Sequence, residues 1–180
     1  MGQGSPRPST PTDPPPTDVT RQTRARTARR IFVAALALFL LGGALDLYGV
    51  RTRTRSVSGG GYELSVTYGS VSRPGLATPF SFEVRRPGGF PQGLTVAARS
   101  SYFDAFDENG FSPTPDTETD DGERTIWQFA PSPAETMTVS LDARIEPGVQ
   151  VARVKGRLEI LSAPDGPAVV AIAFSTFVMP

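Results

Sequence analysis

Residues 137–145 read MTVSLDARI, and this stretch alternates strictly between apolar and polar side chains. Its apolar members are Met137, Val139, Leu141, Ala143 and Ile145. Successive side chains of a β-strand point to opposite faces, so a period of two gives one buried and one solvated face. We therefore expect a strand here that packs one face on an apolar core.

The same alternation recurs on both sides of this stretch, in residues 62–68, 80–85, 94–99, 127–129 and 154–160. Residues 168–178 are apolar on both faces, which is typical of a central strand. Pro- and Gly-rich turn signals such as Pro87-Gly88-Gly89 and Asp165-Gly166-Pro167 separate the segments. The pattern predicts an all-β domain over residues 62–180, an immunoglobulin-like antiparallel β-sandwich of about seven strands. We expect the large apolar rings in its core: Tyr62, Phe80, Phe82 and Trp127.

A long apolar run precedes this domain. Residues 31–50 read IFVAALALFLLGGALDLYGV, with Asp46 as the only charge. A helix of 20 residues is about 30 Å long, which matches the hydrocarbon core of a bilayer. The run predicts a transmembrane helix over 31–50. Cleavage at Gly42-Gly43-Ala44 is the alternative; residues 31–44 would then belong to a signal peptide and the domain would be secreted.

The charges around the run indicate its orientation. Five Arg lie within residues 21–30 and three follow at Arg51, Arg53 and Arg55. Because cytoplasmic flanks carry more Lys and Arg, we expect a single-pass protein of the cell membrane with its N-terminus in the cytoplasm and its C-terminal domain outside. Residues 1–55 carry a net charge of +6 and residues 56–180 a net charge of −6. An acidic domain argues against nucleic acid as a partner.

Two further segments complete the predicted organisation. Residues 1–30 are rich in Pro and Arg with little apolar surface, which predicts a disordered cytoplasmic tail. Residues 51–61 end in Ser58-Gly59-Gly60-Gly61 and are expected to form a flexible linker. Ordering of this linker by contact with the domain is left open.

The residue types limit the chemistry. The chain has no Cys and no His, which excludes disulfides, thiol nucleophiles, Cys/His zinc sites and His-based triads. Residues 104–123 are rich in Asp and Glu, the ligand types of calcium, but their spacing is not that of an EF-hand, and a solvated loop with a hairpin turn at Asp121-Gly122 explains them equally. We expect no catalytic residue, no metal site and no cofactor, and hence no enzyme.

Four aromatic residues surround the acidic segment: Tyr102, Phe103, Phe106 and Phe111. An aromatic group on a long loop is a candidate surface for binding a protein or a glycan. The alternative is a loop folded onto the end of the sandwich with these rings as its own small core.

Two phrases of the sequence carry a resemblance. Residues 73–84, RPGLATPFSFEV, resemble the second-strand phrase of immunoglobulin-like repeats in bacterial surface proteins, and so do residues 125–129, TIWQF, followed by a Pro-rich turn and residues 136–141, TMTVSL. The whole layout is similar to uncharacterised single-pass envelope proteins of GC-rich, actinobacteria-like bacteria. Such families imply no catalytic residues.

These features together predict a non-enzymatic, membrane-anchored envelope protein with a binding or scaffolding β-sandwich. Its partners would be the lipid bilayer and an envelope or membrane protein. The alternative function is a sensor or an accessory subunit of a larger membrane complex.

Overall fold

The computed structural model describes residues 19–44, 49–150 and 152–179. The chain divides into two compact units, Met1–Tyr48 and Gly49–Pro180, and each is described by itself.

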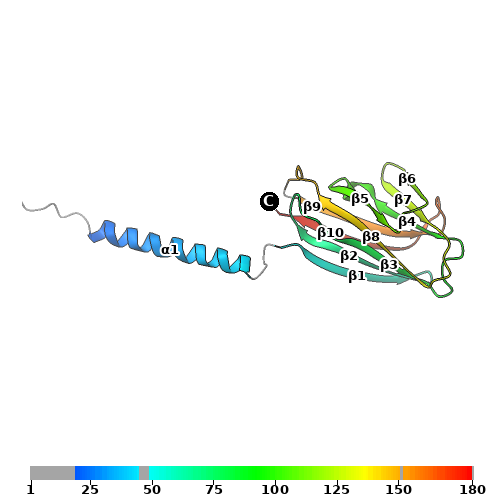
Figure 1. Ribbon diagram of the computed structural model, residues 1–180, viewed down its shortest axis with the longest axis horizontal. Helices are drawn as coiled ribbons and strands as arrows, with labels where there is room; N and C mark the ends of the chain where they lie inside the picture. The colour runs from blue at the N-terminus through cyan, green and yellow to red at the C-terminus, as the bar shows by residue number, and fades with distance from the viewer. Residues whose placement is uncertain (1–18, 45–48, 151, 180) are drawn as a thin grey trace, which may run out of the picture. The chain divides into compact units, whose positions relative to one another are not determined.

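The first unit contains one helix, α1, which spans Val19–Ala44 (Figure 1). Its portion Arg26–Ala44 is long and apolar enough to cross a membrane, although a signal sequence near an N-terminus meets the same criterion. At 1.5 Å per residue these 19 residues span about 28 Å. The large apolar side chains from Ile31 to Leu41 are exposed on the helix, as they would be in a helix that faces lipid.

The boundaries of the helix correct two predictions. Residues 19–30, expected in a disordered tail, are helical, since Arg and Ala are good helix formers and no Pro follows Pro16 before the apolar run. Residues 49 and 50, expected at the end of the transmembrane helix, are not helical. Residues 1–18 of the predicted tail and residues 45–48, which include Asp46, lie outside the described residues.

The second unit is mostly β. Its elements in chain order are β1 (Arg51–Gly59), β2 (Tyr62–Ser72), β3 (Phe80–Arg85), β4 (Leu94–Arg99), α2 (Ser100–Phe103), β5 (Phe106–Ser112), β6 (Thr117–Asp120), β7 (Arg124–Phe129), β8 (Thr136–Ile145), β9 (Ala152–Leu161) and β10 (Ala168–Val178).

The strands form one curled, mixed sheet in the order β5-β8-β3-β2-β10-β9-β4-β7-β6, with β1 paired to β2 (Figure 1). Every pairing is antiparallel except the short parallel contact of β2 with β10, which comprises two residue pairs. The sheet curls so that its two ends face each other. The ring centroids of Phe82 in β3 and Phe129 in β7 are 6.2 Å apart, and those of Phe111 in β5 and Trp127 in β7 are 4.7 Å apart.

The all-β prediction is confirmed, and all seven predicted strands are present as β2, β3, β4, β7, β8, β9 and β10. The predicted number is too low, because β1, β5 and β6 are also strands. The parallel join of β2 with β10 makes the sheet mixed, whereas an all-antiparallel sandwich was expected.

Strand β1 corrects the flexible linker predicted for residues 51–61. It pairs with β2 along its whole length, from Arg51 to Gly59. Polar side chains continue the pairing, since the hydroxyls of Thr54 and Thr67 lie 2.8 Å apart. Gly60 turns the chain at φ 57° beneath β10, where a Cβ would lie 1.9 Å from Val169 Cγ1. The alternative that the sequence left open, ordering by contact with the domain, is the observed one.

The core follows the alternation read from the sequence. In β8, Val139, Leu141, Ala143 and Ile145 are buried while the residues between them are exposed. Phe80, Phe82 and Trp127 are at most 2% exposed, as predicted, and the fourth predicted ring, Tyr62, packs on the core while partly buried.

Candidate functional site

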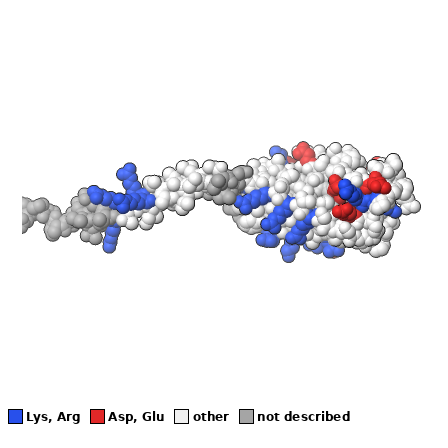
Figure 2. Space-filling view, turned by 90° about the horizontal axis from the view of Figure 1, so that it is seen from below, with Lys and Arg blue, Asp and Glu red and all other residues white. Residues whose placement is uncertain are grey.

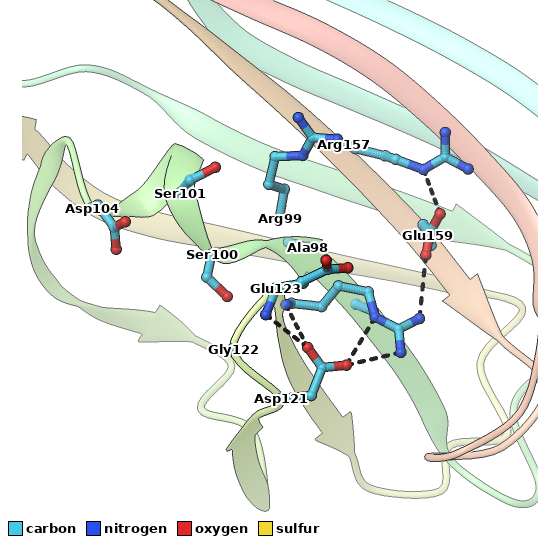
Figure 3. Close-up of a pocket in the computed structure, with 12 residues that line it drawn as sticks. Ala98, Arg99, Ser100, Ser101, Asp104, Asp121, Gly122, Glu123, Arg157 and Glu159 are labelled. Carbon is cyan, nitrogen blue, oxygen red and sulfur yellow. Dashed lines mark hydrogen bonds and ion pairs between the residues drawn. The ribbon is translucent and has the colours of Figure 1, made fainter.

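A hollow of about 820 Å³ opens on the outer face of β4 and β9, beside α2 and the turn between β6 and β7 (Figure 3). Charged side chains of both signs line it: Arg99, Asp104, Asp121, Glu123, Arg124, Arg157 and Glu159. These residues come from three separate segments of the chain, 99–104, 121–124 and 157–159, which the sheet brings together because β4 pairs with both β7 and β9.

Ala97, which lines the hollow, belongs to a second, small apolar cluster. Ala97 of β4 lies opposite Ile126 of β7 and Glu159 of β9 in the two ladders, so the three side chains share the outer face. Ala97, Ile126 and Leu161 are buried together there, apart from the main core. Glu159 sits beside them and is only 8% exposed.

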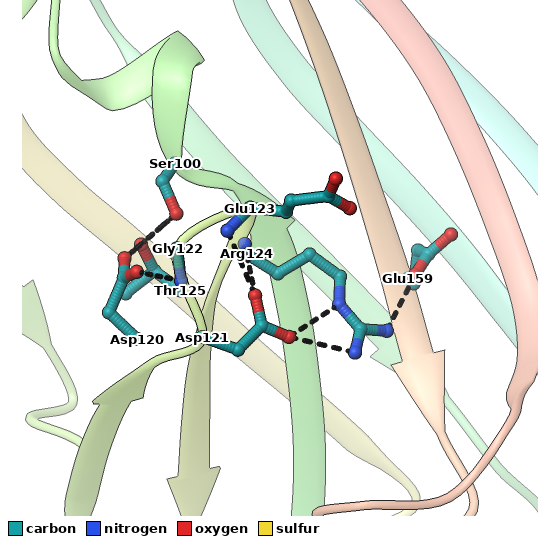
Figure 4. A network of polar contacts seen from close by, with 8 residues as sticks. All are labelled: Ser100, Asp120, Asp121, Gly122, Glu123, Arg124, Thr125 and Glu159. Carbon is teal, nitrogen blue, oxygen red and sulfur yellow. Dashed lines mark hydrogen bonds and ion pairs between the residues drawn. The ribbon is translucent and has the colours of Figure 1, made fainter.

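Glu159 is therefore a nearly buried carboxylate, and two guanidinium groups compensate its charge. Arg157 donates from Nε to Oε1, and Arg124 Nη1 lies 3.7 Å from Oε2. A buried carboxylate of this kind is costly unless it is paired, and removing one partner from such a pair is strongly destabilising. Arg157 points toward Glu159 in Figure 3, and Arg124 points toward it in Figure 4.

Arg124 is fixed from its other side by Asp121 (Figure 4). Asp121 Oδ2 accepts hydrogen bonds from Arg124 Nε at 3.0 Å and Nη2 at 2.9 Å, and Oδ1 accepts from the backbone N–H of Glu123 and Arg124. The backbone hydrogen bond from Arg124, followed by that from Glu123, lowers the pKa of Asp121. The hydrogen bond with Asp121 in turn raises the pKa of Arg124. The predicted hairpin turn at Asp121-Gly122 is confirmed, with Gly122 at φ 89°.

Asp120 ties the same turn to α2. Ser100 Oγ donates to Asp120 Oδ2 at 2.8 Å, Thr125 Oγ1 donates to it at 3.0 Å, and the Gly122 N–H donates to Oδ1 at 2.6 Å (Figure 4). The bond from Ser100 is the largest cause of the lowered pKa of Asp120, followed by that from Gly122. The turn and the first residue of α2 therefore form one hydrogen-bonded rim.

Within the described residues, Arg99, Asp104 and Glu123 line the hollow without a described ion pair. All three belong to the exposed or half-exposed part of the rim. The hollow thus combines a fixed inner network with charges of both signs that are open to a ligand. Such a surface suits a polar ligand that carries charge, because specificity in contacts of this kind comes from electrostatic complementarity.

The four aromatic residues predicted as a partner-binding loop lie elsewhere. Tyr102, Phe103 and Phe106 are buried in the main core at 1%, 8% and 6% exposure, and Phe111 packs against the same core. The structure does bring them together, with Tyr102 and Phe106 ring centroids 5.0 Å apart. The prediction of a contact surface is corrected: α2 and β5 carry these rings inward, where they join the main core and not a separate small one.

The acidic segment 104–123 also differs from an open loop, since it contains β5 and β6. Among the residues that the structure describes, no group of three or more Asp or Glu side chains is placed to hold a metal ion. The oxygens of Asp120 and Asp121 instead accept the hydrogen bonds of the rim.

Sequence reasoning missed the inner network of the hollow. One local signal was present, because Asp121 and Arg124 at positions i and i+3 flank the predicted turn. Arg157 and Glu159 were expected on the solvated face of a strand; Arg157 is exposed as expected, whereas Glu159 is buried. Their convergence with Arg99 and Arg124 depends on the strand order, which the pattern does not specify.

No family model matches the chain, and no curated protein matches it. Among solved structures, the chain is similar to AvmM, described by the words "AvmM Catalyzes Macrocyclization in Alchivemycin A Biosynthesis". The two share 13% sequence identity at a TM-score of 0.33, over 73% of this chain and 90% of that chain.

This match corrects one prediction. The sequence predicted that the chain is not an enzyme, whereas AvmM is described as a catalyst, so that prediction is contradicted and is withdrawn. A likeness with this TM-score transfers neither a reaction nor catalytic residues to this chain.

Proposed function

We propose that this chain is a single-pass membrane protein whose α1 anchors an extracytoplasmic β domain, and that the domain binds a charged partner through the hollow on β4 and β9. The observation that carries the proposal is α1, whose portion Arg26–Ala44 has the length and composition of a membrane span. The β domain has its own core, so its fold does not require α1 as a packing element.

The charges of α1 support a cytoplasmic N-terminus. Arg24, Arg26, Arg29 and Arg30 are exposed on the helix before the apolar run begins at Ile31. Arg near the end of a span favours the cytoplasmic side, and snorkelling keeps the guanidinium at the headgroup level while the stem follows the apolar surface. The finer classification of the domain as immunoglobulin-like belongs to the proposal as well. It is supported by the antiparallel ladder β8-β3-β2 packed across a shared core from β7.

The partner class follows from the chemistry of the hollow. Arg99 offers a cationic group and Glu123 an anionic one beside a rim that Asp120 and Asp121 hold rigid. A segment of an envelope or membrane protein that carries charges of both signs fits this arrangement. A rigid rim lowers the conformational entropy lost on binding.

Site-directed photocrosslinking in membranes tests the binding function. A photoreactive amino acid at Glu123 is expected to give a discrete adduct with a partner protein. The matched control carries the photoreactive amino acid in place of Thr138, which is exposed on β8 away from the hollow. This control is expected to give no adduct. Identical adducts from both positions, or none from Glu123, contradict the role of the hollow.

Membrane extraction tests the anchor. The full chain is expected to resist alkaline carbonate, and Leu38→Arg in the apolar run is expected to release it, because an Arg at the centre of a span costs about 2.5–3.5 kcal/mol of insertion free energy. Leu76→Arg, at an exposed apolar residue of the β domain, is the control and is expected to remain in the membrane. Mature protein that begins near residue 45 would instead identify a secreted domain.

A further inference from the structure

We infer that the β domain docks on anionic lipid headgroups through a basic surface formed by β1, β10 and β9. We call this surface the basic ladder and define it by six residues: Arg51, Arg53, Arg55, Arg153, Lys155 and Arg157. The inference rests on the proposed anchoring by α1. It concerns a surface other than the hydrogen-bonded rim of the hollow; Arg157 belongs both to this surface and to the lining of the hollow.

The pairing register builds the basic ladder. Arg153, Lys155 and Arg157 on β9 lie directly opposite Phe177, Ser175 and Ala173 of β10. On the other side of β10, Arg55 of β1 donates from Nη1 to the backbone carbonyl of Ala173 at 3.0 Å. Arg55 and Arg157 thus flank β10 at the same level.

The other end of the ladder is fixed in the same way. Arg51 of β1 and Phe177 of β10 both pair with Val71 of β2. Arg51 and Phe177 thus lie beside the same residue of β2, and Arg153 of β9 lies opposite Phe177. Arg53 lies between Arg51 and Arg55 along β1, and Lys155 lies between Arg153 and Arg157 along β9, so each of these two strands contributes three basic residues.

The basic ladder is exposed to solvent, and two of its three strands, β1 and β10, contain no acidic residue. All six basic side chains are exposed. Within the described residues, one of the six basic side chains has a described ion pair. This is Arg157, which pairs with Glu159 at one end of the ladder. Figure 2 shows Lys and Arg gathered over the end of the β domain where β1 begins, and Asp and Glu mostly toward the other end.

Two further features favour a lipid surface as the occupant. Six residues, 45–50, join Ala44 to Arg51 in the chain, and at about 3.6 Å per residue an extended chain of this length spans at most about 25 Å. Phe177 is 37% exposed at the end of the ladder where it lies opposite Arg153, and Trp and Tyr are favoured at the headgroup level, where an exposed Phe can also contact lipid. If α1 crosses the bilayer as proposed, a tether of this length limits how far the β domain can move from the membrane, which raises the effective concentration of headgroups.

Charge complementarity sets the expected strength. Each Lys or Arg near an anionic membrane changes the docking constant by about fivefold, and the effect falls off within a Debye length. Removing the three Arg of β1 is therefore expected to weaken docking by roughly a hundredfold. Neutral membranes are expected to leave the domain undocked.

Lys155 provides the assay, because it is the only Lys in the chain. The full chain is placed in nanodiscs of phosphatidylcholine alone or with phosphatidylglycerol, and an uncharged amine-reactive ester is added. Acylation of Lys155 is followed by peptide mass spectrometry. We expect acylation to be at least about fivefold slower in the anionic discs, and the difference to vanish at about 1 M salt, where the Debye length is about 3 Å.

Two charge-matched variants decide the result. R51Q/R53Q/R55Q is expected to abolish the protection of Lys155. R85Q/R86Q/R144Q removes three charges from the β3 and β8 region and is expected to retain it. Equal acylation of Lys155 in both kinds of disc, or protection that survives in R51Q/R53Q/R55Q, overturns the inference.

Two outcomes distinguish docking on lipid from anchoring by α1 and from binding of a soluble anion. A chain that resists carbonate but shows no lipid-dependent protection keeps its anchor and has no docking surface. Protection by a soluble polyphosphate in neutral discs without any effect of phosphatidylglycerol means a soluble anion is the occupant, and it overturns docking on lipid.

Discussion

The hydrogen-bonded pair of Tyr102 and Thr176 allows a stringent test of the core. Thr176 is fully buried, donates from Oγ1 to the Gly69 carbonyl at 2.7 Å, and shares a 2.8 Å hydrogen bond with the Tyr102 hydroxyl. Thr176→Val keeps the shape and removes both bonds. The lost bond to Gly69 costs about 1 kcal/mol and the orphaned Tyr102 hydroxyl about 1–3 kcal/mol, so the free energy of unfolding should fall by about 2–4 kcal/mol.

The double variant turns this estimate into a refutable statement. Tyr102→Phe alone should cost about 1 kcal/mol, but added to Thr176→Val it removes the orphaned hydroxyl and should recover about 1 kcal/mol. Urea unfolding followed by the fluorescence of Trp127, the only Trp, reports on the β domain of the full chain in a mild detergent. The reasoning is refuted if the double variant is no more stable than Thr176→Val.

Two further predictions concern packing and pH. Gly156→Ala should lower the free energy of unfolding by about 1–3 kcal/mol, because the new Cβ would lie 2.2 Å from Phe174 Cε2. Phe174→Leu in the same chain removes the ring and should restore part of the loss. Strictly additive effects of the two substitutions on urea unfolding would contradict this contact. The lowered pKa values of Asp120 and Asp121 stabilise the fold above the ordinary carboxyl pKa of 3.8, and this contribution is lost as the pH falls below that value through the folded pKa values. The urea midpoint should therefore fall at acid pH less steeply in D120N/D121N than in the unmodified chain, and parallel profiles would show that the rim does not titrate as described.

The strands that the sequence predicted are those with one buried face. Apolar alternation in β8 reports the core directly, since every second residue from Val139 to Ile145 is buried. The missed strands lack this signal. β6 reads TETD and is exposed at all four residues, and β1 contains a single apolar residue, Val57, near its C-terminal end. These strands are specified by the partner to which they pair, and a single-sequence pattern does not contain that partner.

The hollow was less predictable than the fold for a related reason. Its turn at Asp121-Gly122 is local and was predicted correctly. Its Glu159 looked like any residue on the wet face of an alternating strand, and its burial depends on Arg124, 35 positions earlier in the chain. Strand order creates that contact. The aromatic prediction was wrong in the opposite sense, since it placed buried residues on the surface. Tyr102 and Phe103 of α2 point inward, and their rings complete the core.

Strand β1 changes the meaning of the charge distribution. A boundary at residue 55 gave +6 and −6 for the two halves, but Arg51, Arg53 and Arg55 belong to the β domain. With the boundary between Tyr48 and Gly49, the N-terminal part carries six Arg and three Asp, and the β domain twelve basic and fifteen acidic residues. The charges become +3 and −3.

This revised division bears on orientation. The three Arg after the apolar run were the main argument against a cytoplasmic N-terminus, since the orientation rule counts basic residues close to both ends of a span. In the folded chain these Arg lie in a strand paired with β2 over nine residues, and Arg55 also binds Ala173 of β10. Their place in the sequence is thus explained by the pairing and exposed charge of β1. The five Arg of residues 21–30 have no comparable role in a β-sheet, so they continue to support the proposed cytoplasmic N-terminus.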